Sequence, residues 1–342
     1  MRRLWWGLTF LVLVVATIGV VMQRHQKEPA PLRQGFGGVK WGEHFIVGYT
    51  DPEEMKILIK AGVGGVFVTQ RNAKGKTLNA LREEIQTFLD IRPDLFIATD
   101  FEGGVVQKLS PPLSRFPAIG EITDVATYAA SQAAELRSVG VNVNFSPVVD
   151  LDPGKIYKGD RYTKISKRAI SDDPKKVTEV ASEYIDGMKA GGIMPTLKHF
   201  PGLRLAEGDT HLKPVVMNVG MDELRSKDWV PFRNLLDKDI WLMLSHVQVP
   251  GLEAMKVIRE EWKFDGVVVS DDWSMGGAGS AMGALNSGVD IILVAFDPEV
   301  YYQVMKEMLV ADQKGEIDRD KLRESEQRID RVRGIVDGHV AQ

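Results

Sequence analysis

The stretch KHFPGLRLAEGDTH, from Lys198 to His211, concentrates side chains that can do chemistry: a lysine, two histidines, two acidic residues and a proline–glycine turn. Near neutral pH a histidine can protonate a leaving oxygen and later take a proton from water. A neighbouring carboxylate can hold its ring and tautomer, and Asp209 stands two residues before His211. The alternative interpretation of DTH is a capped turn in a solvated loop.

A carboxylate nucleophile would complete this chemistry. The chain has no cysteine, and no serine stands in a nucleophile-elbow motif. Among the acids that follow predicted strands, the best candidate is Asp271 in VVVSDDWSMGG. Carboxylate nucleophiles are typical of retaining glycosidases, which ordinarily use a second carboxyl group as acid/base. With His211 in that role, no second negative charge would stand beside the nucleophile.

Eight short apolar runs, rich in β-formers, alternate with longer amphipathic segments such as 77–90 and 174–190. The runs are FIVGY (45–49), GGVFVT (64–69), LFIAT (95–99), VNVNF (141–145), IMPTL (193–197), IWLML (240–244), GVVVS (266–270) and IILVAF (291–296). Such alternation predicts a parallel sheet, and eight units predict a (β/α)8 TIM-type barrel. A doubly wound open sheet is the alternative, although no GxGxxG follows any of these runs.

In a barrel of this kind, functional side chains lie at the carboxyl ends of the strands. Polar residues follow the predicted strands at those positions: Asp100, Asp150, Lys198, His199, His246, Asp271 and Asp272. His211 lies in the loop after the fifth strand, so three of the six histidines fall on one face. Each residue alone could be structural, but together they predict one site.

Composition and charge favour a small-molecule partner. The net charge of the 342 residues is −4, and residues 1–27 hold four basic residues and no acid. The remainder has 39 basic against 47 acidic residues, a net charge of −8, which disfavours nucleic-acid binding. The lack of cysteine excludes disulfides and cysteine metal sites. No metal motif is present, so we expect no metal and no organic cofactor.

The N-terminal segment, residues 1–27, contains an uncharged apolar run at 4–22. Its nineteen residues approach the roughly 20 that span a bilayer and exceed the roughly 7–15 of a signal-peptide core. We therefore expect a membrane anchor with the catalytic domain outside the cytoplasm. A cleaved signal peptide and a secreted protein are the alternative. Residues 28–39 are predicted to be a linker, and residues 40–342 the catalytic barrel.

Over about residues 40–335 the sequence resembles the β-N-acetylhexosaminidases of glycoside hydrolase family 3, specifically the single-domain bacterial enzymes of cell-wall recycling. Five blocks carry the resemblance in the family's order: DFEGGVVQKL, NFSPVVDLD, KHFPG with DTH, FDGVVVSDDWSM and ALNSGVDIILV. In the family, the third block usually reads KHFPGHG, four residues and then DSH. Here the loop has the same length.

The resemblance implies a retaining exo-β-N-acetylglucosaminidase. Asp271 would be the nucleophile, His211 the general acid/base and Asp209 its orienting partner. The residues implied to bind the sugar are Asp100, Lys108, Arg168, Lys198 and His199. Arg161 is a weaker candidate for the role of Arg168. The implied substrates are peptidoglycan fragments or chitin-like oligosaccharides, and the resemblance leaves open phosphate in place of water as acceptor.

Several positions depart from the family pattern or have no assigned role. Leu203 and Arg204 replace His-Gly, which predicts a stiffer loop whose Arg204 could face an anionic part of the substrate. Val105 and Lys108 each stand where the family has an arginine, and Lys108 loses bidentate geometry. We expect Glu102 to be structural, pairing with backbone. Trp273 either stacks on a sugar or packs.

Two other functions remain open on sequence alone. One is a non-catalytic, membrane-tethered saccharide-binding barrel. The other is an aldolase-like barrel enzyme that forms a Schiff base on Lys198. The oligomeric state is also left open.

Overall fold

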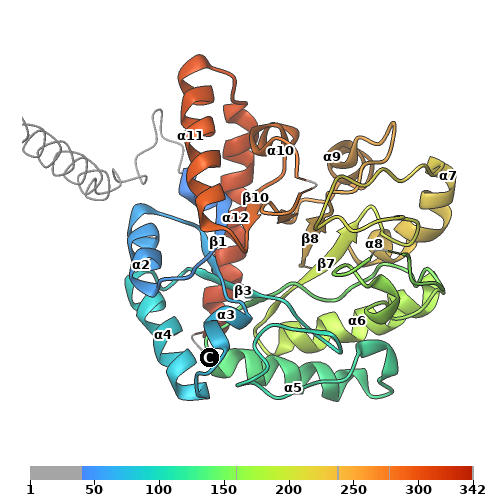
Figure 1. The fold of residues 1–342 in the computed structure, drawn as a ribbon, viewed down its shortest axis with the longest axis horizontal. Coiled ribbons are helices and arrows are strands. Elements are labelled where there is room, and N and C mark those ends of the chain that lie inside the picture. Colours follow the sequence, from blue (N-terminus) through green and yellow to red (C-terminus); the bar gives the residue numbers. More distant parts are fainter. Residues whose placement is uncertain (1–40, 159, 237–238, 277, 341–342) are drawn as a thin grey trace, which may run out of the picture.

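The computed structural model describes residues 41–158, 160–236, 239–276 and 278–340, and in this part of the chain eight parallel strands close a barrel (Figure 1). In barrel order they are β1 (Phe45–Gly48), β10 (Ile291–Val294), β9 (Val268–Asp272), β8 (Trp241–Leu244), β7 (Met194–Phe200), β6 (Val143–Asn144), β3 (Phe96–Thr99) and β2 (Gly65–Phe67). Each strand overlaps one of the eight predicted runs. The (β/α)8 barrel is thus confirmed, and the open-sheet alternative is wrong.

Helices cover the outside of the barrel (Figure 1). They are α2 (Pro52–Ala61), α3 (Gln70–Ala73), α4 (Leu78–Ile91), α5 (Val125–Ser138), α6 (Pro174–Ala190), α7 (Met221–Glu223), α8 (Trp229–Leu235), α9 (Ala254–Lys256), α10 (Ala281–Ser287), α11 (Pro298–Lys314) and α12 (Arg319–Val340). Short helical turns occur at η1 (Trp41–His44), η2 (Ile119–Glu121), η3 (Ile165–Lys167), η4 (Leu224–Asp228) and η5 (Val257–Glu261), and β4 (Phe101–Gly103) pairs with β5 (Val106–Gln107).

Three of the helices begin with the same Asp-Pro signal. Asp51, Asp173 and Asp297 are the N-caps of α2, α6 and α11, and each carboxylate accepts the backbone N–H two residues further on. Proline follows as the first helical residue, where its missing N–H costs nothing and its fixed φ suits the helix.

The alternation of side chains along the strands decides what enters the barrel. Val267 and Val269 pack in the interior cluster, with the stacked rings of Phe67 and Phe145, while Val268 packs on the outer side, toward the helices. Successive side chains of a strand point to opposite faces. Asp271, two residues after Val269, is therefore directed to the barrel interior at the strand's carboxyl end.

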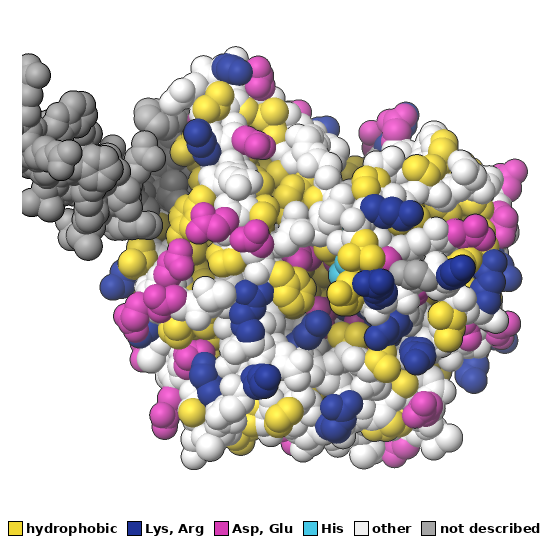
Figure 2. Space-filling view, viewed as in Figure 1, with side chains coloured by type: hydrophobic (Ala, Val, Ile, Leu, Met, Phe, Trp, Pro, Cys, Tyr) yellow, Lys and Arg dark blue, Asp and Glu magenta, His cyan; other side chains and the backbone are white. Residues whose placement is uncertain are grey.

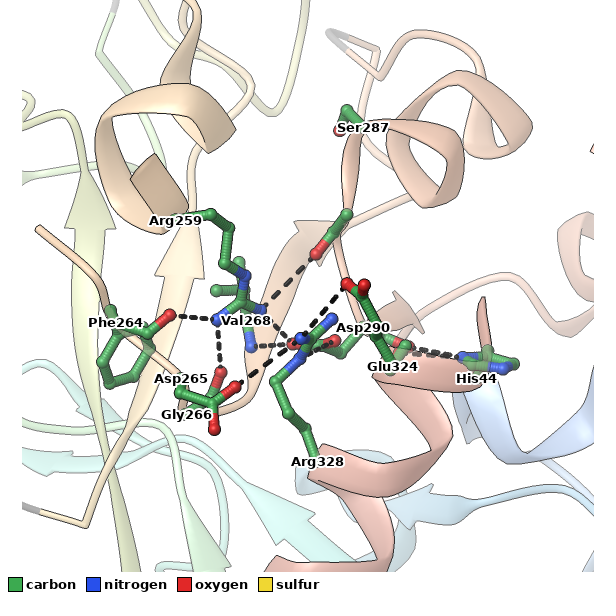
Figure 3. A network of polar contacts seen from close by, with 12 residues as sticks. His44, Arg259, Phe264, Asp265, Gly266, Val268, Ser287, Asp290, Glu324 and Arg328 are labelled. Atoms are coloured by element: carbon green, nitrogen blue, oxygen red, sulfur yellow. Dashed lines mark hydrogen bonds and ion pairs between the residues drawn. The ribbon is translucent and has the colours of Figure 1, made fainter. Parts of the chain in front are cut away.

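A buried carboxylate, Asp290, ties the last helix to the barrel (Figure 3). Asp290 Oδ1 accepts a bond of 2.9 Å from Nε of Arg328 on α12, and Oδ2 accepts one of 2.6 Å from Nη2 of Arg259 on η5. The backbone N–H of Val268 also donates to Oδ2, and His44 Nδ1 lies 2.9 Å from the Asp290 carbonyl oxygen. Helix, strand and N-terminal turn are thus joined at one residue.

Replacing Asp290 with alanine is expected to lower the free energy of unfolding by about 3–5 kcal/mol, because two largely buried guanidinium groups lose their shared partner. Urea unfolding followed by circular dichroism measures the change. Asp265→Ala is the matched control, because Asp265 is exposed: it pairs with Arg331 at 2.7 Å and contacts the same Arg328 only at 3.7 Å. Equal losses in the two variants would contradict the assignment of Asp290 as the central tie.

The predicted anchor at 1–27 and the linker at 28–39 lie outside the described residues. Within the part of the chain that the structure describes, no helix is both long and apolar enough to cross a bilayer.

Candidate active site

A cavity of about 500 Å³ opens at the carboxyl ends of the strands. Seven of the eight predicted site residues line it: Asp100, Lys108, Arg168, Lys198, His199, His211 and Asp271. The eighth, Asp209, contacts His211 behind the cavity wall. Figure 2 looks onto this face, where histidine atoms are visible in a central hollow with lysine and arginine side chains around it. The structure therefore brings all eight residues together.

Lys198 is buried at the cavity floor between two carboxylates. Its Nζ lies 2.8 Å from Asp100 Oδ1 and 2.6 Å from Glu102 Oε1. Burial alone lowers the pKa of Lys198, but the two carboxylates outweigh it and raise that pKa above its usual value. Lys198 is therefore a charged hydrogen-bond donor. It lies within β7, which continues three residues beyond the predicted run.

Glu102 pairs with side chains, so the expectation that it pairs with backbone is wrong. Arg168 donates to both of its carboxylate oxygens, at 2.9 Å from Nε and 2.7 Å from Nη2. Burial opposes the charge of Glu102, but Arg168 and Lys198 hold its pKa below the ordinary value. Glu102 thus positions two of the predicted sugar-binding residues, which sequence reasoning missed because the partners are 66 and 96 positions away.

Asp150 orients His199. His199 Nδ1 lies 2.6 Å from Asp150 Oδ2, and Arg168 Nη2 lies 3.2 Å from His199 Nε2. An arginine can only donate, so Nε2 accepts and the ring proton lies on Nδ1, where it is donated to Asp150. The position of Asp150 just past a strand marked it for the site, but no role was assigned to it from sequence.

The carboxylate of Asp209 is buried and holds His211. His211 Nδ1 lies 2.9 Å from Asp209 Oδ1, and the His211 backbone N–H donates to the same oxygen at 3.0 Å. Burial raises the pKa of Asp209, but backbone N–H donors, first that of Tyr162, and the neighbouring His211 bring it below its usual value. A charged Asp209 keeps a proton on Nδ1 and leaves Nε2 of His211 for proton exchange.

Asp271 and Asp272 differ sharply in what their carboxylates do. Asp272 Oδ1 accepts from the backbone N–H of Ala295 at 2.7 Å and from Ser274, which ties β9 to the end of β10. Burial raises the pKa of Asp272. In Asp271 only Oδ1 accepts a bond, from the Asp272 backbone N–H. Both residues line the cavity, but Oδ2 of Asp272 is fully buried without a partner, whereas Asp271 is partly exposed, so Asp271 is the acid whose carboxylate is accessible from the cavity.

The charge of Asp271 is stabilised by its neighbours. Desolvation by itself raises the pKa of Asp271, but the positive charge that three neighbouring histidines carry in their protonated forms outweighs it and holds that pKa below its usual value. His199 has the largest of these effects, followed by His246 and His211. An ionised carboxylate at neutral pH is what a nucleophile in this position requires.

Arg204 and His246 lie differently from what the sequence predicted, and for Trp273 the structure decides between the two alternatives. Arg204 does not face the cavity: its guanidinium binds the buried Asp228 at 3.0 and 2.9 Å and Glu223 at 2.8 Å. His246 and Trp273 pack against each other, with ring centroids 5.2 Å apart, and line a second cavity beside η5 and α10. Trp273 therefore packs, and His246 affects Asp271 by charge, from outside the first cavity.

The two other departures from the family pattern do line the cavity. Val105 is exposed there, and Lys108 Nζ lies 5.3 Å from the ring centroid of Phe296. Among the described residues, no three or more His, Cys, Asp or Glu side chains are grouped so that they could hold a metal ion.

Comparison with known proteins gives one family. The sequence profile described as "Glycosyl hydrolase family 3 N terminal domain" matches residues 39–332. A protein named "Beta-hexosaminidase" from Pseudomonas aeruginosa is 35% identical over 269 residues, which cover 72% of this chain and 79% of that protein.

Solved structures agree with the fold. The beta-N-acetylhexosaminidase of Beutenbergia cavernae is 25% identical with a TM-score of 0.75, covering 90% of this chain and 100% of that one. A glycoside hydrolase family 3 beta-N-acetylglucosaminidase from Paenibacillus has a TM-score of 0.78 at 24% identity. The match covers 86% of this chain and 62% of the Paenibacillus protein.

Proposed function

The chain belongs to glycoside hydrolase family 3, and we propose that it is a retaining exo-β-N-acetylglucosaminidase. One observation carries this proposal: an available carboxylate, Asp271, and a histidine held by a buried carboxylate, His211, line the same cavity. The names of the related proteins support β-linked N-acetylhexosamine as the sugar.

The first step forms a glycosyl-aspartate. The Asp271 carboxylate attacks C1 of the β-linked sugar while the Nε2–H of His211 protonates the leaving oxygen. Asp209 stabilises the doubly protonated ring that precedes this transfer. In the second step Nε2 of the now neutral His211 takes a proton from water, and the water oxygen displaces Asp271 from C1. Two inversions at C1 give net retention.

Charged donors and acceptors at the cavity floor suit a sugar. Asp100, Lys198 and His199 would hold its hydroxyl groups, with Arg168 and Lys108 beside them. Peptidoglycan fragments or chitin-like oligosaccharides are the natural substrates that we propose. We further propose that residues 1–27 form a membrane anchor that holds the barrel outside the cytoplasm. Alkaline extraction of membranes tests the anchor, because a cleaved form of the protein would be released.

The two other functions considered from the sequence, a Schiff-base enzyme and a saccharide-binding barrel, have weaker support. A Schiff-base lysine must be neutral to attack a carbonyl, whereas Lys198 is held charged by Asp100 and Glu102. A barrel that only binds saccharides would have no need of an oriented proton donor facing an available carboxylate.

Incubation of the full chain with an aryl β-N-acetylglucosaminide tests the proposal. The expected result is release of the phenol with β-N-acetylglucosamine as the first anomer seen by NMR. The α-anomer first would exclude retention, and no release would exclude the activity. A parallel reaction with inorganic phosphate distinguishes hydrolysis from phosphorolysis, because only the latter yields a sugar phosphate.

A further inference from the structure

The chain that carries His211 has little regular structure of its own. Residues 201–220, here called the His211 loop, are all described by the structure; they contain no helix, and only Val216 forms an isolated β-bridge, with Gln248. The conformation of so long a loop depends on its contacts with the rest of the fold. The place of His211 at the cavity is therefore decided by the side chains that hold this loop.

Arg204 ties the first half of the His211 loop to a helix on the barrel wall. Its Nε and Nη2 donate to the two carboxylate oxygens of Asp228 at 3.0 and 2.9 Å, and Nη2 also donates to Glu223 at 2.8 Å. Asp228 ends η4, and α8 follows it beside β7, where the rings of Trp229 and Phe200 lie 5.4 Å apart between centroids (Figure 1). A two-pronged arginine–carboxylate pair fixes direction as well as distance.

The pair between Arg204 and Asp228 is buried. The side chain of Asp228 is 2% exposed and that of Arg204 is 11% exposed. Burial raises the pKa of Asp228, and Arg204 acts in the opposite direction. The loop is closely fitted here, because Gly202 has a φ of 106° and a Cβ on it would lie 3.1 Å from the Cβ of Asp228. A buried carboxylate left without its partner is costly, so loss of Arg204 is expected to displace the loop.

Arg204 lies between two other contacts of the His211 loop, and neither of them fixes the loop to a helix. At the start of the loop, the backbone N–H of Leu203 donates to Asp150 Oδ1 at 2.8 Å. Further along, Asp209 accepts bonds from residues 161–163, which themselves belong to an irregular segment. This second contact joins one loop to another. The connection to a helix packed on the barrel comes from Arg204.

We propose that Arg204 is a positioning residue for the glycosidase reaction: its pair with Asp228 holds the His211 loop where His211 can protonate the leaving oxygen. Arg204 is not among the residues that line the cavity, so it acts through the loop. The inference rests on the proposed function, because it concerns the histidine assigned there as general acid. It also replaces the sequence-based expectation for Arg204, since the acids that this arginine meets belong to its own chain.

The test compares kcat/KM for two substrates that share a β-N-acetylglucosaminyl group. One carries a second N-acetylglucosamine, whose departure needs a proton, and the other carries a dinitrophenolate, whose departure does not. Arg204→Ala is expected to lower the ratio of kcat/KM between the first and the second substrate by roughly tenfold to hundredfold, because a displaced His211 transfers its proton poorly while Asp271 stays in place. A smaller amount of folded enzyme would reduce both values equally.

A double variant separates positioning from folding. Arg204→Ala/Asp228→Asn removes the tether together with the buried charge that Arg204→Ala leaves unpaired. Its midpoint of urea unfolding is therefore expected to be closer to that of the wild type, while its ratio stays as low as in Arg204→Ala. Arg225→Ala is the matched control, because Arg225 lies on the same η4 but pairs with Glu261 at the surface, at 2.6 and 2.9 Å. This control is expected to keep the wild-type ratio.

Three results would overturn the role of Arg204. The first is a wild-type ratio in Arg204→Ala. The second is a double variant whose ratio returns to the wild-type value together with its stability, and the third is an equal loss in Arg225→Ala. If the wild type cleaves neither substrate, the proposed function itself fails, which is a distinct result.

Discussion

Asp271→Ala is expected to lower kcat for an aryl β-N-acetylglucosaminide by at least about 10⁴-fold, because no other carboxylate can replace it. Asp100 is paired with Lys198, and Asp272 is engaged by the backbone of Ala295. Glu102 is held by Arg168 and Lys198. The cavity would then still bind the sugar but would lack a group to attack C1.

Rescue by a small anion distinguishes a nucleophile from a structural acid. Azide that enters the space of the missing carboxylate attacks C1 from the α face, so Asp271→Ala should produce the α-glycosyl azide. Steady-state release of the phenol gives the rates, and NMR gives the anomer. Near-wild-type turnover by a folded Asp271→Ala protein would show that the nucleophile is another group.

His211→Ala is expected to lower kcat by about 10²- to 10⁴-fold for leaving groups that need protonation, such as a second sugar. The loss should be much smaller for a dinitrophenolate, which departs without a proton. A plot of log kcat against the pKa of the leaving phenol should therefore be steeper for the variant than for the wild type. Asp209 keeps its N–H donors from Arg161 and Tyr162, so the loop should remain in place.

His246→Ala is the matched control for this experiment. His246 also carries a ring close enough to affect the charge of Asp271, but it lines the second cavity and bonds to the Asp272 carbonyl oxygen. Any decrease in kcat caused by His246→Ala should not depend on the leaving group. A slope for His211→Ala equal to that of the wild type would remove His211 from the acid/base role.

Much of the architecture follows from local sequence patterns. Apolar runs separated by amphipathic segments predict the strands and helices, and the Asp-Pro pairs at Asp51, Asp173 and Asp297 mark where helices begin. Strand ends were harder to predict. β7 and β9 extend through Lys198, His199, Asp271 and Asp272, because pairing with neighbouring strands keeps these polar residues extended where side-chain polarity predicted a loop.

Residue types and their spacing were enough to predict the barrel, the face that carries the site and the Asp209–His211 pair. These features depend on neighbours in sequence or on the alternation of strands and helices. The tertiary structure alone decided which charges pair. Glu102 with Arg168, Asp150 with His199, and Asp209 with the loop at Arg161 join positions 66, 49 and 48 residues apart. Such contacts exist only because barrel closure brings the loops of different strands to one end, where burial forces each charge to find a partner.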